Sequence, residues 1–210
     1  MPKDQLNLKE TREMFIQVSQ KMMENTDQLT QADKAIGDGD HGVGMSRGFE
    51  AALKKLEGPP MTAMDEMVKA IGTAFITSVG GSAGAIFGTF FRSAAKNLAG
   101  QQVLDSHVLS LMLLDGLQAV KERGKAKTGD KTMVDALEPA AQKAQELVTA
   151  PLHESLKGVA EAARQGVEKT KEMIATLGRA KTLGERSLGH PDPGALSTYL
   201  ILKYMMEYTQ

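Results

Sequence analysis

The sequence contains no cysteine and no tryptophan, and aromatic residues make up only 4% of its 210 residues. Without cysteine, the chain has no disulfide, no thiolate metal ligand and no cysteine nucleophile. Basic and acidic residues nearly balance, at 25 and 26, so the basic excess that sequence-independent nucleic-acid binding needs is missing. The scarcity of aromatic rings also disfavours base-stacking platforms. We therefore expect no nucleic-acid partner.

Long apolar runs are missing as well. No stretch approaches the roughly 18 uninterrupted apolar residues of a membrane span, and residues 1–5 provide no apolar signal-peptide segment. We expect no membrane partner and a cytoplasmic location, which also fits the absence of cysteine. Runs of β-branched residues bounded by turns are absent too, so the sequence predicts no β-strand.

Helical periodicity is present from end to end. Apolar residues recur at a spacing of 3.6, with charged residues between them. Pro59 and Pro60 separate two of the predicted helices, and Thr62 is expected to cap the second of these. The pattern predicts helices over residues 7–28, 43–56, 62–77, 83–98, 106–122, 132–148, 151–177 and 193–208. We expect one all-α domain over residues 1–210 with about eight helices.

The first loop of interest carries Asp33, Asp38 and Asp40 among glycines. Hard cations such as Mg²⁺ prefer carboxylate oxygens. Residues 37–42 match Gly-x-Gly-x-x-Gly, but no strand precedes them, and their aspartates would repel a pyrophosphate unless a metal were bound. A solvated turn with helix-capping aspartates is the alternative. Because crowded carboxylates raise one another's pKa, we favour a bound metal, with His41 as a weaker candidate for a base.

Three further glycine-rich loops suit an anionic ligand. Residues 78–84 enter a buried helix, which indicates either an anion site at its N-terminus or close packing of small residues. Residues 123–133 nearly form a Walker A loop, but Asp130 interrupts the motif. The arginines of residues 178–194 could clamp phosphates or pair with Glu185. Together the loops predict a metal-bridged phosphate ligand, most simply a nucleotide.

Several motifs occur together, in a specific order and spacing: Gly37-Asp-Gly-Asp-His-Gly42, Gly80-Gly81, Phe87-Gly-Thr-Phe-Phe91, Arg123-Gly-Lys-Ala126, Gly129-Asp-Lys-Thr-Met133 and Gly184-Glu-Arg-Ser-Leu-Gly-His-Pro-Asp-Pro-Gly194. Over nearly its full length the chain resembles the nucleotide-binding L subunits of dihydroxyacetone kinase. The resemblance implies an eight-helix antiparallel barrel with the nucleotide site in loops at one end. It also implies ADP (or ATP) as the bound nucleotide, held through two Mg²⁺ ions.

The resemblance further assigns residues and partners. It makes Asp33, Asp38 and Asp40 the metal ligands. Its nucleotide-binding residues are His41, Gly42, Val43, Gly44, Ser82, Ala83, Gly124, Met133, Arg179, Asp192, Pro193 and Gly194. The implied partners are a K subunit that carries dihydroxyacetone and a donor M subunit of the phosphotransferase system, and a homodimer is left open. The alternatives are a related ketose kinase subunit using exchangeable ATP and a non-catalytic, nucleotide-sensing interaction module.

Overall fold

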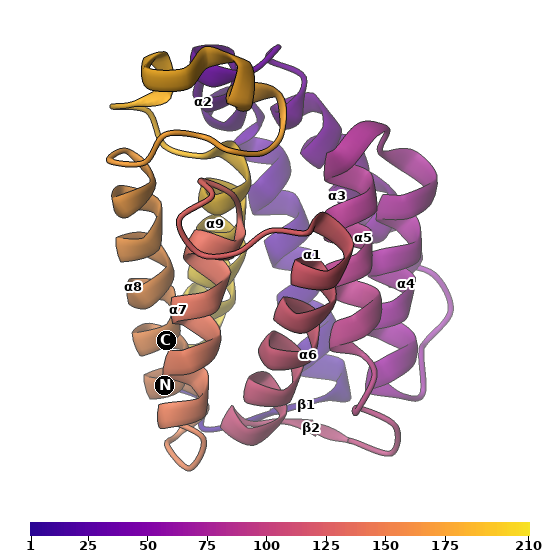
Figure 1. Ribbon diagram of the computed structural model, residues 1–210. Coiled ribbons are helices and arrows are strands. Elements are labelled where there is room, and N and C mark those ends of the chain that lie inside the picture. Colours follow the sequence, from indigo (N-terminus) through magenta and orange to yellow (C-terminus); the bar gives the residue numbers. More distant parts are fainter.

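Eight long helices alternate in direction around a closed ring in the computed structural model, which describes all 210 residues (Figure 1). The α-helices are α1 (Leu8–Glu24), α2 (Thr26–Ile36), α3 (His41–Leu56), α4 (Met64–Ser78), α5 (Gly81–Ala94), α6 (Ser106–Gly124), α7 (Val134–Glu146), α8 (Leu152–Thr170) and α9 (Pro193–Thr209). A 3₁₀ helix, η1 (Arg179–Ser187), and two short strands, β1 (Leu6–Asn7) and β2 (Val103–Leu104), complete the chain. No helix combines the length and apolar character that crossing a membrane requires.

The ring closes because α9 packs against α1 after the other helices have packed in sequence order from α3 to α8. This arrangement confirms the predicted all-α fold and its antiparallel barrel. α2 and η1 contact each other outside the ring, at the end where the glycine-rich loops gather (Figure 1). Both chain termini lie toward the opposite end, where the N–H of Lys3 donates to the carbonyl of Thr209 at 2.8 Å.

The predicted helix over residues 7–28 is wrong in its continuity, because the chain breaks at Asn25. The side-chain amide of Asn25 donates to the carbonyl of Lys21 at 2.8 Å and to the hydroxyl of Tyr204 at 2.7 Å. Such side-chain bonds compete with the backbone bonds that would continue a helix. The chain then starts α2, which extends to Ile36. Asp33 therefore lies in the last turn of a helix and not in a loop.

Three other expectations also need correction. The helix predicted over residues 151–177 ends at Thr170, whose carbonyl accepts a hydrogen bond from the ammonium of Lys131. Thr62 does not cap α4, whose N-cap position is held by Ala63 without a side-chain bond. Strands β1 and β2 pair antiparallel although none was expected, since two-residue strands are too short for a periodic pattern.

The few aromatic residues are concentrated in the core. All six phenylalanines are buried. Phe75 lies at the centre of this group, with its ring centroid 4.9 Å from that of Phe49, 5.7 Å from that of Phe91 and 6.1 Å from that of Phe87. These rings join α3, α4 and α5 on one side of the barrel. The small aromatic content is thus sufficient because the rings pack against one another.

We predict that Phe75→Ala lowers the free energy of unfolding by about 3–5 kcal/mol, because it removes a fully buried ring and leaves a cavity. Ile76→Ala is the matched control, since its side chain is 45% exposed on the same helix. We expect the control to cost less than about 1 kcal/mol. Urea unfolding followed by circular dichroism measures both, and equal losses would contradict the central position of Phe75.

Candidate functional site

A pocket of about 590 Å³ opens at the end of the barrel where α2 and η1 lie. The alternating helix directions bring the N-termini of α3, α5, α7 and α9 to this pocket, where His41, Gly81, Val134 and Pro193 belong to its lining. A helix N-terminus carries partly positive, unpaired N–H groups. Four such ends around one cavity favour an anionic ligand.

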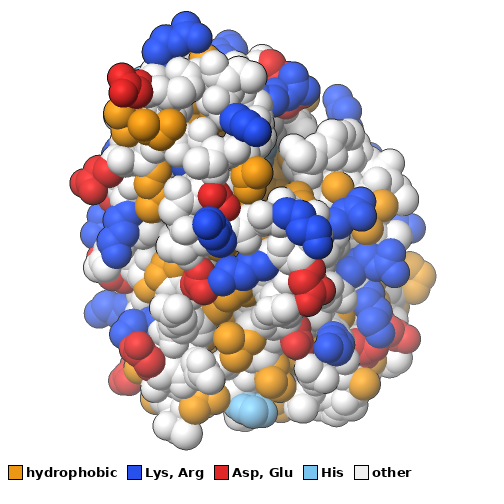
Figure 2. Space-filling view, in the orientation of Figure 1, with side chains coloured by type: hydrophobic (Ala, Val, Ile, Leu, Met, Phe, Trp, Pro, Cys, Tyr) orange, Lys and Arg blue, Asp and Glu red, His pale blue; other side chains and the backbone are white.

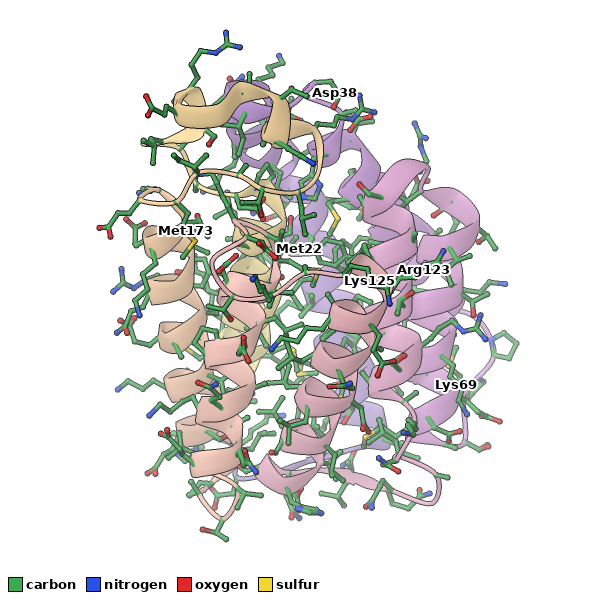
Figure 3. The ribbon with its side chains drawn as sticks, in the orientation of Figure 1. Met22, Asp38, Lys69, Arg123, Lys125 and Met173 are labelled. Atoms are coloured by element: carbon green, nitrogen blue, oxygen red, sulfur yellow. The ribbon has the colours of Figure 1, made fainter.

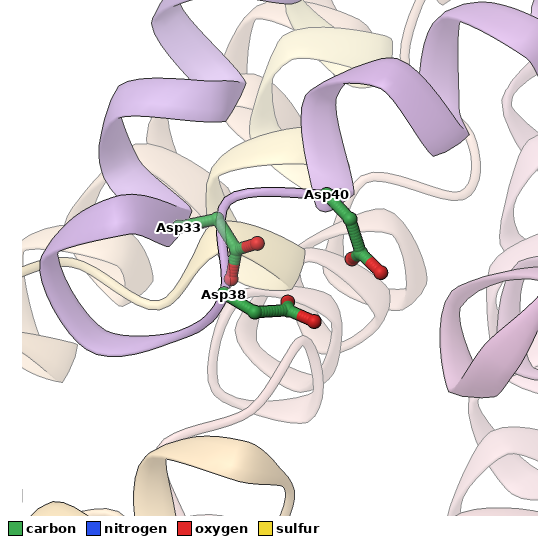
Figure 4. Close-up of side chains that lie close together, drawn as sticks. All are labelled: Asp33, Asp38 and Asp40. Carbon is green, nitrogen blue, oxygen red and sulfur yellow. The ribbon is translucent and has the colours of Figure 1, made fainter.

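Three aspartates lie together at one side of this pocket. Asp33 comes from the last turn of α2, Asp38 from the following turn, and Asp40 from the position before α3. One oxygen from each carboxylate lies within 4.8 Å of the others, and Figure 4 shows the three groups turned toward a common space. Gly37 permits the close approach, because a Cβ there would lie 2.2 Å from Oδ1 of Asp33.

The charges of this cluster are only partly compensated. Burial, and next the negative charge of Asp38, raise the pKa of Asp40. Arg179 of η1 opposes this effect with one nitrogen 2.5 Å from Oδ2 of Asp38 and another 3.8 Å from Oδ2 of Asp40. The predicted alternative, an ion pair between Glu185 and an arginine, does not form. An all-oxygen cluster of this kind suits a hard divalent cation such as Mg²⁺.

His41 lines the pocket but is fixed by the barrel. Its Nε2 lies 2.8 Å from the hydroxyl of Ser197 in α9, and its backbone N–H donates to Oδ2 of Asp33 at 3.1 Å. Burial lowers the pKa of His41, which favours a neutral imidazole at pH 7. His41 is therefore placed to connect α9 with the aspartate cluster.

The Gly80–Gly84 turn combines both of the roles left open by the sequence. A Cβ on Gly84 would lie 2.0 Å from the carbonyl of Val79, so this glycine serves close packing. Gly80 and Gly81, by contrast, face open space, and Gly81 has a φ of 67°. They lead into α5, whose N-terminus has no side-chain cap, beside Ser82 and Ala83 in the pocket lining. The first part of the turn therefore presents free backbone N–H groups to a ligand.

The opposite wall of the pocket is apolar. Ile86, Phe87 and Val120 lie there with Met133 and Leu177. Arg123 and Lys125 follow at the end of α6, as Figure 3 shows, on a face where Lys and Arg side chains gather (Figure 2). An apolar wall opposite a carboxylate cluster suits a ligand with a flat ring at one end and phosphates at the other.

Asp130, the residue that interrupts the Walker-like motif, has a structural role. Its Oδ1 accepts from the hydroxyl of Thr176 at 2.7 Å, and its Oδ2 accepts from the N–H of Lys127 at 2.8 Å. The bond from Thr176 lowers the pKa of Asp130, although burial opposes it. The loop 125–133 is thus bound to the segment after α8 and does not form a phosphate cradle of the Walker type.

The structure brings most of the predicted site residues together. Those that line the pocket are Asp33, Asp38, Asp40, His41, Ser82, Ala83, Gly124, Met133, Arg179, Asp192, Pro193 and Gly194. Gly42, Val43 and Gly44 do not, since they lie in the first turn of α3. Gly42 packs against α2, where a Cβ would lie 2.3 Å from the carbonyl of Thr26, and the side chain of Val43 is 50% exposed. Their roles as ligand contacts stay predictions.

Sequence reasoning missed other lining residues, among them Ile36, Ile86, Phe87, Val120, Arg123, Lys131 and Leu177. The apolar members follow the same 3.6 periodicity as the core, so nothing in the sequence distinguishes a pocket wall from the barrel interior. Arg123 belongs to a motif that the sequence analysis quoted, and its place at the end of a predicted helix was the one available signal.

Asp192 provides a test of the pocket's electrostatics. Burial raises the pKa of this carboxyl from 3.8 to about 7, while the N–H of Ala195 that it accepts opposes the rise. The folded protein thus keeps a proton that the unfolded chain releases, so this group's contribution to stability decreases as pH rises from about 4 to about 7. We predict that Asp192→Asn, which can still cap α9, flattens this dependence. Urea unfolding without metal or nucleotide at pH 5, 6 and 7 measures it, and an unchanged slope would exclude the shift.

Comparisons with known proteins agree with this geometry. The DAK2 domain family matches residues 35–207. The chain is 38% identical over 189 residues to the ADP-binding subunit DhaL of PEP-dependent dihydroxyacetone kinase 1 from Listeria innocua, covering 90% of both chains. It is also 38% identical over 181 residues to the corresponding DhaL subunit from Escherichia coli, covering 84% of this chain and 85% of the relative.

A solved structure shows the same fold. The dihydroxyacetone kinase from C. freundii, in complex with AMP-PNP and Mg²⁺, aligns with a TM-score of 0.74 and 26% identity. The alignment covers 93% of this chain and 33% of that kinase, so the chain spans about a third of its length. The fold, the family match and the full-length relatives agree, and the chain belongs to the DAK2 domain family, among the ADP-binding L subunits of dihydroxyacetone kinases.

Proposed function

We propose that this chain is the nucleotide-carrying subunit of a multi-subunit dihydroxyacetone kinase. In this function it binds ADP with two Mg²⁺ ions and relays a phosphoryl group. The group comes from a donor subunit of the phosphotransferase system and goes to dihydroxyacetone held on a separate K subunit. The observation that carries the proposal is the single pocket, where a three-carboxylate cluster, four helix N-termini and an apolar wall meet.

The donor set of the pocket fits the proposed ligand. Asp33, Asp38 and Asp40 supply only oxygen atoms, as Mg²⁺ prefers, and their mutual repulsion is relieved by a cation. The free N–H groups around Gly81 and the N-terminus of α9 suit phosphate oxygens. The apolar residues on the other wall suit an adenine ring. Metal and nucleotide thus have separate sides of one cavity.

The residues have distinct tasks in the proposed transfer. Bound Mg²⁺ would supply neutralisation of the phosphate charge. Arg179 lies on the exposed side of the aspartates and can turn its guanidinium from Asp38 to a phosphate oxygen, to which it can donate two hydrogen bonds. His41 contributes by orientation, because its neutral ring is held by Ser197. The chain therefore positions and neutralises, which is the main task of a protein in phosphoryl transfer.

The first prediction concerns the ligand itself. Native mass spectrometry of the purified protein should detect bound ADP and Mg²⁺. Asp38→Ala should lose both, because it removes a metal ligand and leaves the phosphates uncompensated. Asp65→Ala is the control, since Asp65 lies on α4 in an exposed ion pair with Lys69. Retention of nucleotide by the Asp38 variant would disprove the assignment of the site.

The second prediction concerns the phosphoryl donor. With a K subunit and dihydroxyacetone present, we expect sugar phosphate to form when the phosphotransferase donor is added and not when free ATP replaces it. This result follows if ADP stays bound as a cofactor. Formation with ATP alone would favour the related ketose kinase with exchangeable nucleotide. Failure with both donors, despite bound nucleotide, would favour a nucleotide-sensing module.

A further inference from the structure

Lys131 is a buried lysine whose side chain joins three segments at the pocket. It is 2% exposed and belongs to the loop 125–133. Its ammonium donates to the carbonyl of Thr170 at the end of α8, at 2.5 Å, and to the carbonyl of His190 at 2.6 Å. No carboxylate lies within ion-pair distance, although Asp135 and Asp192 are near enough to favour its charge. Its polar partners are therefore mainly backbone carbonyls from two other segments.

The backbone at Lys131 makes this choice of residue informative. Its φ of 59° lies in the left-handed region, where glycine is the least strained residue. Burial of the ammonium adds a desolvation cost, and burial accordingly lowers the pKa of Lys131. Glycine would avoid both costs, so the lysine here is explained by what its ammonium does.

The segments that Lys131 joins hold two opposite parts of the pocket lining. His190 leads into the Asp192–Gly194 turn, and the N–H of Asp192 donates to the hydroxyl of Thr170 at 3.0 Å. On the other side, Met133 follows Lys131 by two residues, and a Cβ on Gly194 would lie 3.3 Å from Cβ of Met133. The distance between Met133 and the N-terminus of α9 is thus set at the point where the ammonium binds.

We propose that Lys131 is a positioning residue for the nucleotide, fixing the Asp192–Gly194 turn and the start of α9 against Met133. The inference rests on the proposed function, since it names how that same site is held in shape. Lys131 does so through backbone carbonyls and requires no contact with the ligand. Removal of the ammonium should loosen the turn and weaken nucleotide binding while the barrel persists.

The absence of cysteine makes a direct test feasible. Lys131→Cys creates the only thiol of the chain, which can be alkylated in the unfolded state with 2-bromoethylamine to restore a side-chain ammonium. Alkylation with iodoacetamide gives a neutral arm in the same protein. By calorimetry with ADP and Mg²⁺, we expect at least a tenfold loss of affinity with the neutral arm and recovery to within about threefold with the ammonium. Lys127→Met, on the exposed part of the same loop, should bind as the unchanged protein does.

Hydrogen exchange gives a readout that does not depend on the nucleotide. In the ligand-free protein, the neutral arm should accelerate exchange of the Asp192 and Ala195 amides at least tenfold and leave the core amides of α4 unchanged. Equal affinity and exchange with both arms would overturn the inference, as would a general loss of protection. If the unmodified protein binds no ADP, the proposed function fails, whereas the exchange experiment still decides whether Lys131 holds the turn.

Discussion

The pocket depends on the alternation of helix direction around a ring that closes between α9 and α1. In an antiparallel ring every second helix starts at the same end, so α3, α5, α7 and α9 all begin at the pocket. No single loop could gather as much unpaired N–H density. The buried contacts that close the barrel and the electrostatics of the pocket are therefore two results of one packing arrangement.

Charge at the pocket is balanced in a way that suits a ligand of mixed sign. The helix ends attract an anion, whereas Asp33, Asp38 and Asp40 attract a cation. In the protein alone, Arg179 supplies part of the positive charge from the exposed 3₁₀ helix. A metal–phosphate complex satisfies both demands at once, and either component alone satisfies only one. This explains why the family combines an acidic cluster with glycine-rich helix starts.

The sequence predicted the parts of the fold and site that rest on local patterns. The stripes of α3 to α7, and the grouping of Asp38 and Asp40 by Gly37 and Gly39, could be read directly. The break at Asn25 could not, because it depends on the distant hydroxyl of Tyr204. Nor could the early end of α8, where the ammonium of Lys131 takes the carbonyl of Thr170. These features, like the apolar pocket wall, are decided by contacts between segments far apart in the sequence.

The two chain termini meet at the end of the barrel away from the pocket, where Lys3 and Thr209 are hydrogen-bonded. The helices between the two ends, such as α1 and α9 with 17 residues each, are ~25 Å long at 1.5 Å per residue. A polypeptide leaving either terminus needs roughly eight extended residues to travel that distance. Any domain tethered there must therefore reach the pocket mouth along the outside of the barrel, by a long linker or by its own bulk, and a short tag at either terminus leaves the mouth open.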